Sequence, residues 1–345
     1  MRTLIIGAGL SGLALAEAFE RAGHDYLLVD ARARVGGRIL TEHVGGAAFD
    51  LGPAWFWSGQ PRIAALIERL GLQKFDQYAA GALTFEDAQG HVQRGRGFAS
   101  MEGSWRLEGG LGAVTAALHR RLSQDRVRLN ALVTALSRTL DGIAAKLAGG
   151  ETLHAGRVVL ALPPRVATQI DFEPALPKAT MAVMGGVPTW MAGQAKAVAV
   201  YETAFWRTAG LSGDATSRFG PMVEIHDASP DRGGPGALFG FIGVPPEGRA
   251  DVPVLRQQLL AQLVRLFGPN AAQPIKLIVQ DWAYDPLTAT DADRAPLYAH
   301  PDYGMPAALQ GLWDGRLSMA GTEVAQQFGG YLEGALEAAE AVMRA

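Results

Sequence analysis

The first thirty residues constrain what this chain can fold into more than any other stretch. Arg2 to Ile6 holds a short apolar run that is too brief for a helix and suits a buried parallel strand. The glycine-rich turn from Gly7 to Gly12 follows, and then an Ala- and Leu-rich segment that predicts a helix ending near Gly23. A second apolar run, residues 26–29, stops at Asp30. This order of strand, turn, helix, strand and acidic residue predicts a dinucleotide-binding unit.

The turn has a physical reason for each of its glycines. Gly7 allows the chain to turn tightly, Gly9 allows the backbone to approach a pyrophosphate, and Gly12 allows the helix to pack close to the strand. The phosphates then lie beside the first amides of the helix, at Leu10 and Ser11, which have no partner inside the helix. In a chain with 43 glycines such a pattern alone is weak evidence, and the flanking strands and the acidic residue give it weight.

The residues after the second strand indicate which dinucleotide is bound. Asp30 stands where an acidic residue accepts hydrogen bonds from the adenosine ribose. The run Arg-Ala-Arg-Val-Gly-Gly-Arg follows at residues 32–38, and Phe-Asp-Leu-Gly comes at residues 49–52. Arg38 offers a forked, permanently charged donor suited to phosphate, although a surface arginine in a loop is the alternative. The two runs resemble the flavin-containing amine oxidase superfamily, which includes monoamine and polyamine oxidases, L-amino-acid oxidases and phytoene-desaturase-like enzymes.

The end of the chain carries a second match to the same superfamily. Residues 317–323 read Leu-Ser-Met-Ala-Gly-Thr-Glu, and residues 328–335 read Phe-Gly-Gly-Tyr-Leu-Glu-Gly-Ala. In the superfamily, the corresponding strand and helix start cup the ribityl chain and the flavin ring. Free N–H groups at a helix start also favour negative charge on a reduced flavin. The alternative is that these glycines only allow close packing of a terminal helix.

The resemblance implies a set of residues for the cofactor. The expected cofactor is FAD. We expect it to be held without a covalent bond, because the chain has no cysteine for the superfamily's covalent link. Asp30 replaces the superfamily's usual glutamate, which shortens the reach to the ribose. The expected FAD-binding residues are Gly7, Gly9, Leu10, Ser11, Gly12, Asp30, Ala31, Arg32, Gly36, Gly37, Arg38, Leu51, Gly52, Pro53, Ala54, Val133, Gly321, Thr322, Glu323, Gly330, Tyr331 and Leu332.

Two residues are expected to act in catalysis. Lys196 begins an apolar strand that resembles the superfamily segment in which a buried lysine holds a water against the flavin. A cation there favours electron transfer to O2, whereas a solvated lysine at a strand start is the alternative. Tyr331 is expected to form one wall of an aromatic cage beside the flavin. Counting from Trp282, the position of the second wall holds Ala292, which casts doubt on simple primary-amine oxidation.

The substrate-binding residues follow partly from the resemblance and partly from strand alternation. The expected set is Trp55, Trp57, Glu224, His226, Phe241 and Tyr331. Alternation along residues 222–226 places Met222, Glu224 and His226 on one face of a strand. Glu224 would pair there with a distal cation of a diamine-like substrate if that face points inward. The alternative, given equal weight, is that Glu224 and His226 face solvent and the apolar face of the strand packs against the protein core.

The expected fold is mixed, α/β plus α+β. A discontinuous Rossmann-like FAD-binding domain is expected from residues 1–75, 105–165 and 310–345. An inserted substrate domain on a mostly antiparallel sheet is expected from residues 76–104 and 166–309, where strand-like runs dominate. About thirty residues stand where the large monoamine oxidases have a long helical insertion.

Composition narrows the remaining classes of function. The formal net charge of −3 is spread along the chain, which gives no basis for a nucleic-acid or membrane-surface partner. With no cysteine there are no disulfides, and no metal site is expected. The strand beginning at residue 2 leaves no room for a signal peptide, and no apolar run is long enough to cross a membrane. We therefore expect a soluble, cytoplasmic protein that acts on a small molecule, in an unknown oligomeric state.

The expected function is that of an FAD-dependent oxidoreductase. The leading hypothesis is oxidation of an amine C–N bond to an imine, with O2 as acceptor and hydrogen peroxide as product. One alternative is a desaturase or dehydrogenase that acts on a carbon skeleton and uses another acceptor. The other is a flavin-binding protein without turnover, since a fold does not fix an activity.

Overall fold

A five-stranded parallel sheet organises the first half of the fold. The computed structural model describes residues 1–295, 297 and 299–344. The strand order is β20 (Leu317–Met319), β13 (Arg157–Leu160), β1 (Thr3–Ile6), β2 (Tyr26–Val29) and β9 (Val127–Arg128). Every residue of β1 and β2 is buried, as the short apolar runs predict for strands covered on both faces. All five strands end at one edge, which brings the glycine turn, Asp30 and the segment after β20 together.

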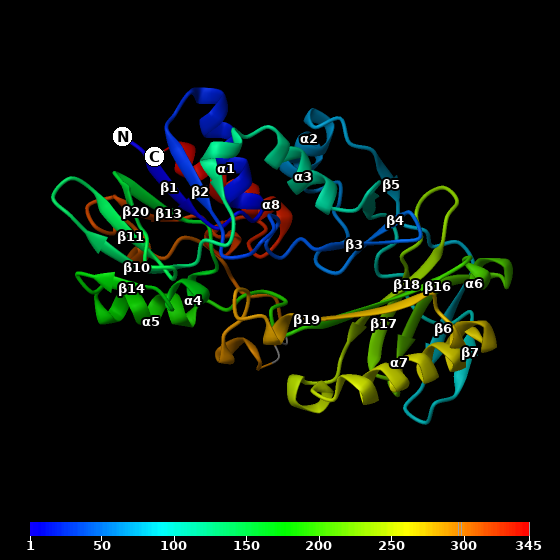
Figure 1. Ribbon diagram of the computed structural model, residues 1–345. Helices are drawn as coiled ribbons and strands as arrows, with labels where there is room; N and C mark the ends of the chain where they lie inside the picture. The colour runs from blue at the N-terminus through cyan, green and yellow to red at the C-terminus, as the bar shows by residue number, and fades with distance from the viewer. Residues whose placement is uncertain (296, 298, 345) are drawn as a thin grey trace.

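Two layers cover this sheet (Figure 1). The helices on one face are α1 (Leu10–Ala22), α2 (Pro61–Arg69), α3 (Gly112–Arg120) and α8 (Leu332–Arg344), which share an apolar core with β1 and β2. The other face carries a smaller sheet of β12 (Thr152–Ala155), β11 (Ile143–Leu147), β10 (Val133–Arg138) and β14 (Asp171–Glu173), with the helices α4 (Pro164–Ala167) and α5 (Lys178–Gly186). Residues 171–186 thus pack on this face of the first sheet.

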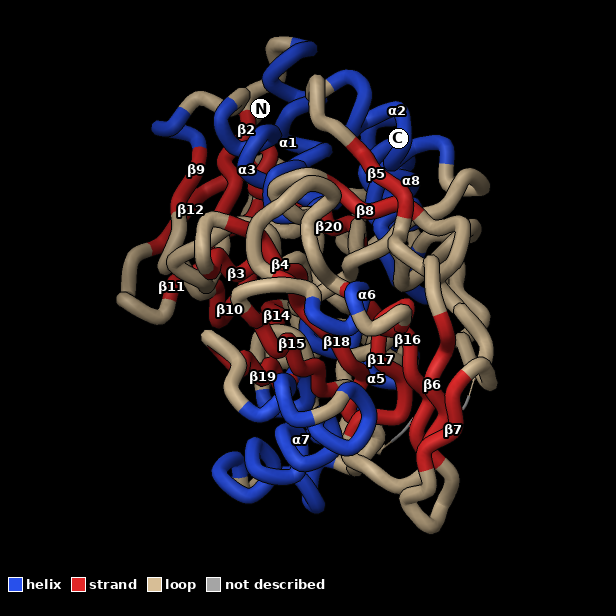
Figure 2. Tube along the Cα trace, turned by 90° about the vertical axis from the view of Figure 1, so that its right-hand side faces the viewer, coloured by secondary structure: helices blue, strands red, loops and turns tan. Residues whose placement is uncertain are grey.

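A seven-stranded sheet forms the other half. Its order is β19 (Lys276–Asp281), β15 (Ala195–Tyr201), β18 (Gly236–Ile242), β17 (Met222–Asp227), β16 (Leu211–Ser217), β6 (Ala82–Glu86) and β7 (Val92–Arg94). The pairing is antiparallel except between β16 and β6. Helix α7 (Val252–Phe267) packs on one face, and Figure 2 shows it below the strands. The other face packs against residues of the hairpin β3 (Thr41–Val44) and β4 (Ala47–Asp50) and against Trp55.

The remaining elements are short. Helix α6 (Phe205–Thr208) precedes β16, and β5 (Lys74–Asp76) pairs with β8 (Trp105–Leu107). Among the described residues, no helix is long and apolar enough to cross a membrane.

One expectation about side-chain direction is wrong. Strict alternation would place Met222 on the same face as Glu224 and His226, but β17 has a bulge between residues 222 and 224. The extra residue reverses the direction of what precedes it. Met222 therefore packs into the core under α7, together with Ile225.

Candidate active site

A cavity of about 330 Å³ lies where the carboxyl edge of the five-stranded sheet meets the face of the seven-stranded sheet. Residues from both ends of the chain and from the middle line it. Of the residues expected to bind cofactor or substrate or to act in catalysis, those on its wall are Gly7, Gly9, Leu10, Ser11, Asp30, Arg32, Gly36, Gly37, Arg38, Gly52, Pro53, Ala54, Trp55, Trp57, Lys196, Phe241, Gly321, Thr322, Gly330, Tyr331 and Leu332.

Asp30 fixes the shape of the glycine turn as well as lining the cavity. Its two carboxylate oxygens accept hydrogen bonds from the backbone amides of Ala8 (2.7 Å) and Arg32 (2.8 Å). Ser11 donates to the carbonyl oxygen of Ala320 at 2.5 Å, which ties the start of α1 to the end of β20. A carboxylate has about four lone-pair sites, so Asp30 keeps acceptor capacity for ribose hydroxyls.

Arg38 is the charged arginine of the wall that pairs with Glu323, a buried carboxylate behind the wall. The guanidinium Nη1 of Arg38 lies 2.6 Å from Oε1 of Glu323 and leaves other donors available on the cavity side. The second oxygen of Glu323 is buried, and no described residue forms a hydrogen bond with it. Buried acceptors are normally satisfied, so a hydroxyl of a bound ligand fits this position. Together with the free amides at the start of α1, these groups match the phosphates and hydroxyls of a flavin dinucleotide.

Lys196 brings a buried ammonium to the cavity. It stands on β15, is 6% exposed, and donates to the carbonyl oxygen of Gly52 at 2.6 Å. Burial lowers the pKa of Lys196 to about 8, although the nearby charge of Asp50 partly offsets that effect. Burial likewise raises the pKa of Asp50 to about 6, against hydrogen bonds from Thr41 and the amide of Leu111. Lys196 is therefore largely cationic at neutral pH and loses its charge in mildly alkaline solution.

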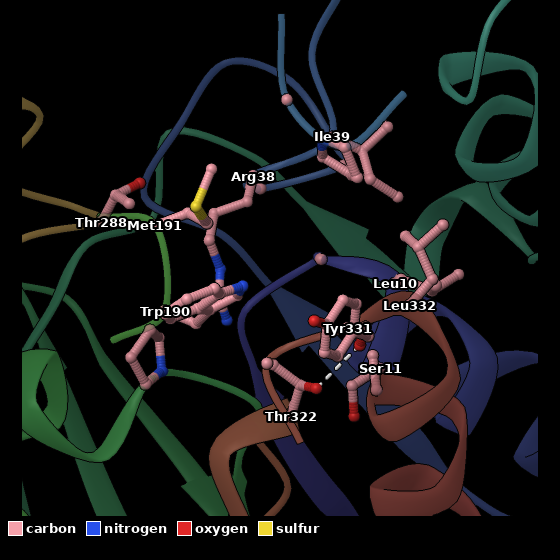
Figure 3. Close-up of a pocket in the computed structure, with 18 of the residues that line it drawn as sticks. Leu10, Ser11, Arg38, Ile39, Trp190, Met191, Thr288, Thr322, Tyr331 and Leu332 are labelled. Carbon is pink, nitrogen blue, oxygen red and sulfur yellow. Dashed lines mark hydrogen bonds between the residues drawn. The ribbon is translucent and has the colours of Figure 1, made fainter. Parts of the chain in front are cut away.

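The structure supplies a second aromatic side chain that sequence reasoning missed. Trp190 lines the cavity together with Tyr331, and Figure 3 shows both beside Arg38. His300 lies between the two aromatic groups, stacked on Tyr331 with ring centroids 5.1 Å apart and edge-on to Trp190 at 4.8 Å. Ala292, where the sequence places the missing wall, is exposed and not on the cavity wall.

The backbone around Tyr331 explains why glycines precede it. A Cβ built on Gly330 would lie 2.8 Å from the Cβ of Trp190, and one on Gly329 would lie 2.4 Å from the Cβ of Tyr303. The hydroxyl of Thr322 also donates to the carbonyl oxygen of Tyr331 at 2.8 Å (Figure 3). The position of Tyr331 is therefore fixed by the close packing of Tyr303 and Trp190 on the glycine backbone that precedes it.

Half-buried Glu224 and buried His226 form a charged array next to the cavity, not on its wall. His226 is 1% exposed, and its two ring nitrogens lie 2.6 Å from Asp214 and 2.8 Å from Glu224. Burial lowers the pKa of His226, but the hydrogen bonds to the two carboxylates outweigh it and leave the pKa raised. Trp55, which lines the cavity, contacts His226 edge-on with centroids 5.3 Å apart.

Other expected residues also lie off the wall. Val133 is buried in the core around β10, and the remaining members of this group are Gly12, Ala31, Leu51 and Glu323. Residues that line the cavity without having been expected are Ile39, Gln60, Met101, Ala161, Leu162, Pro163, Trp190, Met191, Trp282, Leu287, Thr288 and Ala335. Few of these residues belong to a sequence pattern that predicts a cavity position. The two exceptions are the prolines that follow β13, and Trp190, an aromatic residue shortly before the strand of Lys196.

Comparisons with known proteins agree with this geometry. Residues 91–343 match the family described as flavin containing amine oxidoreductase, and residues 5–70 match the NAD(P)-binding Rossmann-like domain. A Mycobacterium tuberculosis protein named flavin-containing monoamine oxidase AofH is 25% identical over 98% of this chain and 94% of its own. Putrescine oxidase of Kocuria rosea is 23% identical over 83% and 82% of the two chains.

Solved structures show the same fold. Putrescine oxidase bound to putrescine superposes with a TM-score of 0.81 at 21% identity and covers 100% of both chains. Cyclohexylamine oxidase from Brevibacterium oxydans gives 0.81 at 21% identity, over 99% of this chain and 97% of its own. The protein is an FAD-dependent, amine oxidase-like oxidoreductase, and the chain belongs to the flavin-containing amine oxidoreductase family.

Proposed function

We propose that this enzyme oxidises an amine C–N bond to an imine and passes the electrons to O2, with hydrogen peroxide as product. The observation that carries the proposal is a single cavity lined by the dinucleotide turn, two aromatic rings and the buried Lys196. The names of the related putrescine and cyclohexylamine oxidases support an amine as the substrate class.

The cofactor is FAD, held without a covalent bond. The amides at the start of α1 and the guanidinium of Arg38 bind the pyrophosphate, Asp30 accepts from the ribose, and the free oxygen of Glu323 accepts from a further hydroxyl. Bound flavin supplies the two-electron acceptor for the C–H bond next to nitrogen. The chain contains no cysteine, so a thioether link to the protein has no donor. In this proposal residues 1–75, 105–165 and 310–345 form the FAD-binding domain, and residues 76–104 and 166–309 form the substrate domain.

The substrate amine lies among aromatic side chains. The aromatic side chains on the wall include Trp55, Trp190, Phe241 and Tyr331. A desolvated amine has a lowered pKa, so this environment holds the substrate neutral and ready for oxidation without a separate general base. Lys196 acts on the oxygen side, where its positive charge stabilises negative charge developing on O2.

An anaerobic screen tests the activity. The purified, FAD-loaded protein is mixed with monoamines, diamines and amino acids while the flavin absorbance is recorded. An amine substrate bleaches the yellow colour, and admission of air restores it with one equivalent of peroxide. Bleaching that air does not reverse would identify a dehydrogenase, and no bleaching by any nitrogen compound would contradict amine oxidation.

The glycine turn provides a test of the cofactor site with an internal control. A Cβ built on Gly9 has no atom of the described part of the chain within 4 Å, whereas one on Gly12 lies 1.9 Å from the carbonyl oxygen of Gly7. We expect Gly9→Ala to fold with unchanged thermal stability as apoprotein and to lose flavin affinity, because only a bound phosphate occupies that space. Gly12→Ala should instead destabilise the apoprotein by about 1–3 kcal/mol. Thermal melts and flavin titration measure both; full affinity in Gly9→Ala would refute the assigned phosphate site.

The charge of Lys196 predicts a pH dependence of the oxygen reaction. A lysine is cationic below its pKa, so the rate of oxidation by O2 should fall as pH rises through about 8. Lys196→Met should abolish this pH dependence and slow the oxygen step on the order of 10²-fold, while anaerobic reduction by the amine stays normal. Stopped-flow measurement of the two half-reactions decides the matter. A variant that reacts with O2 at the wild-type rate would make Lys196 a purely structural residue.

The charged array behind Trp55 predicts substrate selectivity. Glu224 accepts hydrogen bonds from His226 and Ser100 on the same oxygen, and Met101, next to Ser100, lines the cavity. The second carboxylate oxygen is then available to the distal cation of a diamine. Glu224→Gln should raise the KM for diamines roughly tenfold, a loss typical of a charged hydrogen bond, with little change for monoamines. Equal changes for both classes in steady-state assays would exclude this role.

A further inference from the structure

The segment after β19 reaches across the cavity to the nucleotide side of the fold. Nη2 of Arg32 lies 2.9 and 2.8 Å from the two carboxylate oxygens of Asp285 and 3.0 Å from the hydroxyl of Thr288. The side chains of Arg32 and Asp285 are only 14% and 20% exposed. Arg32, Leu287 and Thr288 line the cavity. The contact therefore closes one side of the space that the cofactor site occupies.

The position of Arg32 indicates which part of the cofactor is covered. Its backbone amide donates to Asp30, the acidic residue at the end of β2. In dinucleotide folds that acidic residue marks the adenosine ribose. The contact between Arg32 and Asp285 thus lies two residues along the chain from the residue that marks the ribose.

The segment that carries Asp285 is a turn held by its own hydrogen bonds and anchored by the residue that precedes it. The backbone amides of Thr288 and Ala289 bond to the carbonyl oxygen of Asp285, and the amide of Leu287 bonds to its carboxylate at 3.0 Å. Just before the turn, the indole of Trp282 donates to the carbonyl oxygen of Leu51 at 2.9 Å. The turn can therefore keep its shape whether or not it contacts Arg32.

We propose that the contact of Arg32 with Asp285 and Thr288 is a clasp that retains the adenosine side of bound FAD. The cofactor leaves when this turn separates from Arg32, so the strength of the ion pair sets the rate of flavin release. The proposal rests on the assignment of the cavity to FAD. It gives Asp285 a positioning role, outside the chemistry on the substrate.

The test measures flavin release from the holoprotein after dilution, by recovery of free-flavin fluorescence. Asp285→Asn keeps an acceptor for the turn but removes the charge, and should speed release roughly tenfold. Thr288→Val, which removes one acceptor, should give a smaller increase and decides the question if Asp285→Asn fails to fold. Added salt should speed release in the wild type more than in Asp285→Asn, because screening weakens a partly exposed ion pair.

The control is the same substitution in a pair at the opposite edge of the five-stranded sheet. Asp25→Asn breaks the ion pair of Asp25 with Arg2, and should leave release unchanged. Release from Asp285→Asn at or below the wild-type rate, or an equal increase in Asp25→Asn, would overturn the clasp. If the wild-type protein holds no FAD, the proposed function fails together with the clasp. If it holds FAD but Asp285→Asn releases it at the wild-type rate, the clasp alone fails.

Discussion

The short segment Leu51–Gly52 holds the two sheets in their relative position. Its carbonyl oxygens accept hydrogen bonds from the ammonium of Lys196 on β15 and from the indole of Trp282, which follows β19. On its other side, a Cβ at Gly52 would lie 2.0 Å from the carbonyl oxygen of Arg38, so backbone packs directly on backbone. These contacts bring Lys196 of the seven-stranded sheet and the backbone of Arg38, in the loop after β2, to opposite sides of this segment.

The electrostatics of the cavity follow from this arrangement. Arg38 is neutralised by Glu323, whereas Lys196 is hydrogen-bonded to a carbonyl, which carries no charge. Among the described residues no carboxylate forms an ion pair with the Lys196 ammonium, and the cost of removing this charge from water lowers its pKa. Asp50 lies close enough to offset part of that cost but is itself buried, which shifts its pKa in the opposite direction. The cavity thus has a guanidinium paired with a carboxylate on one side and an ammonium whose charge depends on pH on the other.

The parts of the fold that sequence predicts best are those whose pattern is local. The runs of β1, β2 and α7 carry apolar periodicity and turn residues, and the structure has all three where the pattern places them. The glycine turn and the ending around Tyr331 likewise appear on the cavity wall. The place of Trp190 on the cavity wall could not be predicted because it depends on packing against Gly330, which is distant in the chain. The direction of Met222 depends on a bulge, which periodicity does not reveal.

The contact between Ser11 and Ala320 joins residues separated by 309 positions. The strand–turn–helix unit of β1 and α1 is made well before β20, which pairs with β13 in the same sheet. At ribosomal rates of about 5–20 residues per second, the unit waits roughly 15–60 s for β20. Until then, the apolar edge of β13 has no neighbour on that side. A newly made chain of this topology therefore exposes an unpaired strand edge from the synthesis of β13 until that of β20, which makes shielding by chaperones more valuable to it than to a protein built from consecutive hairpins.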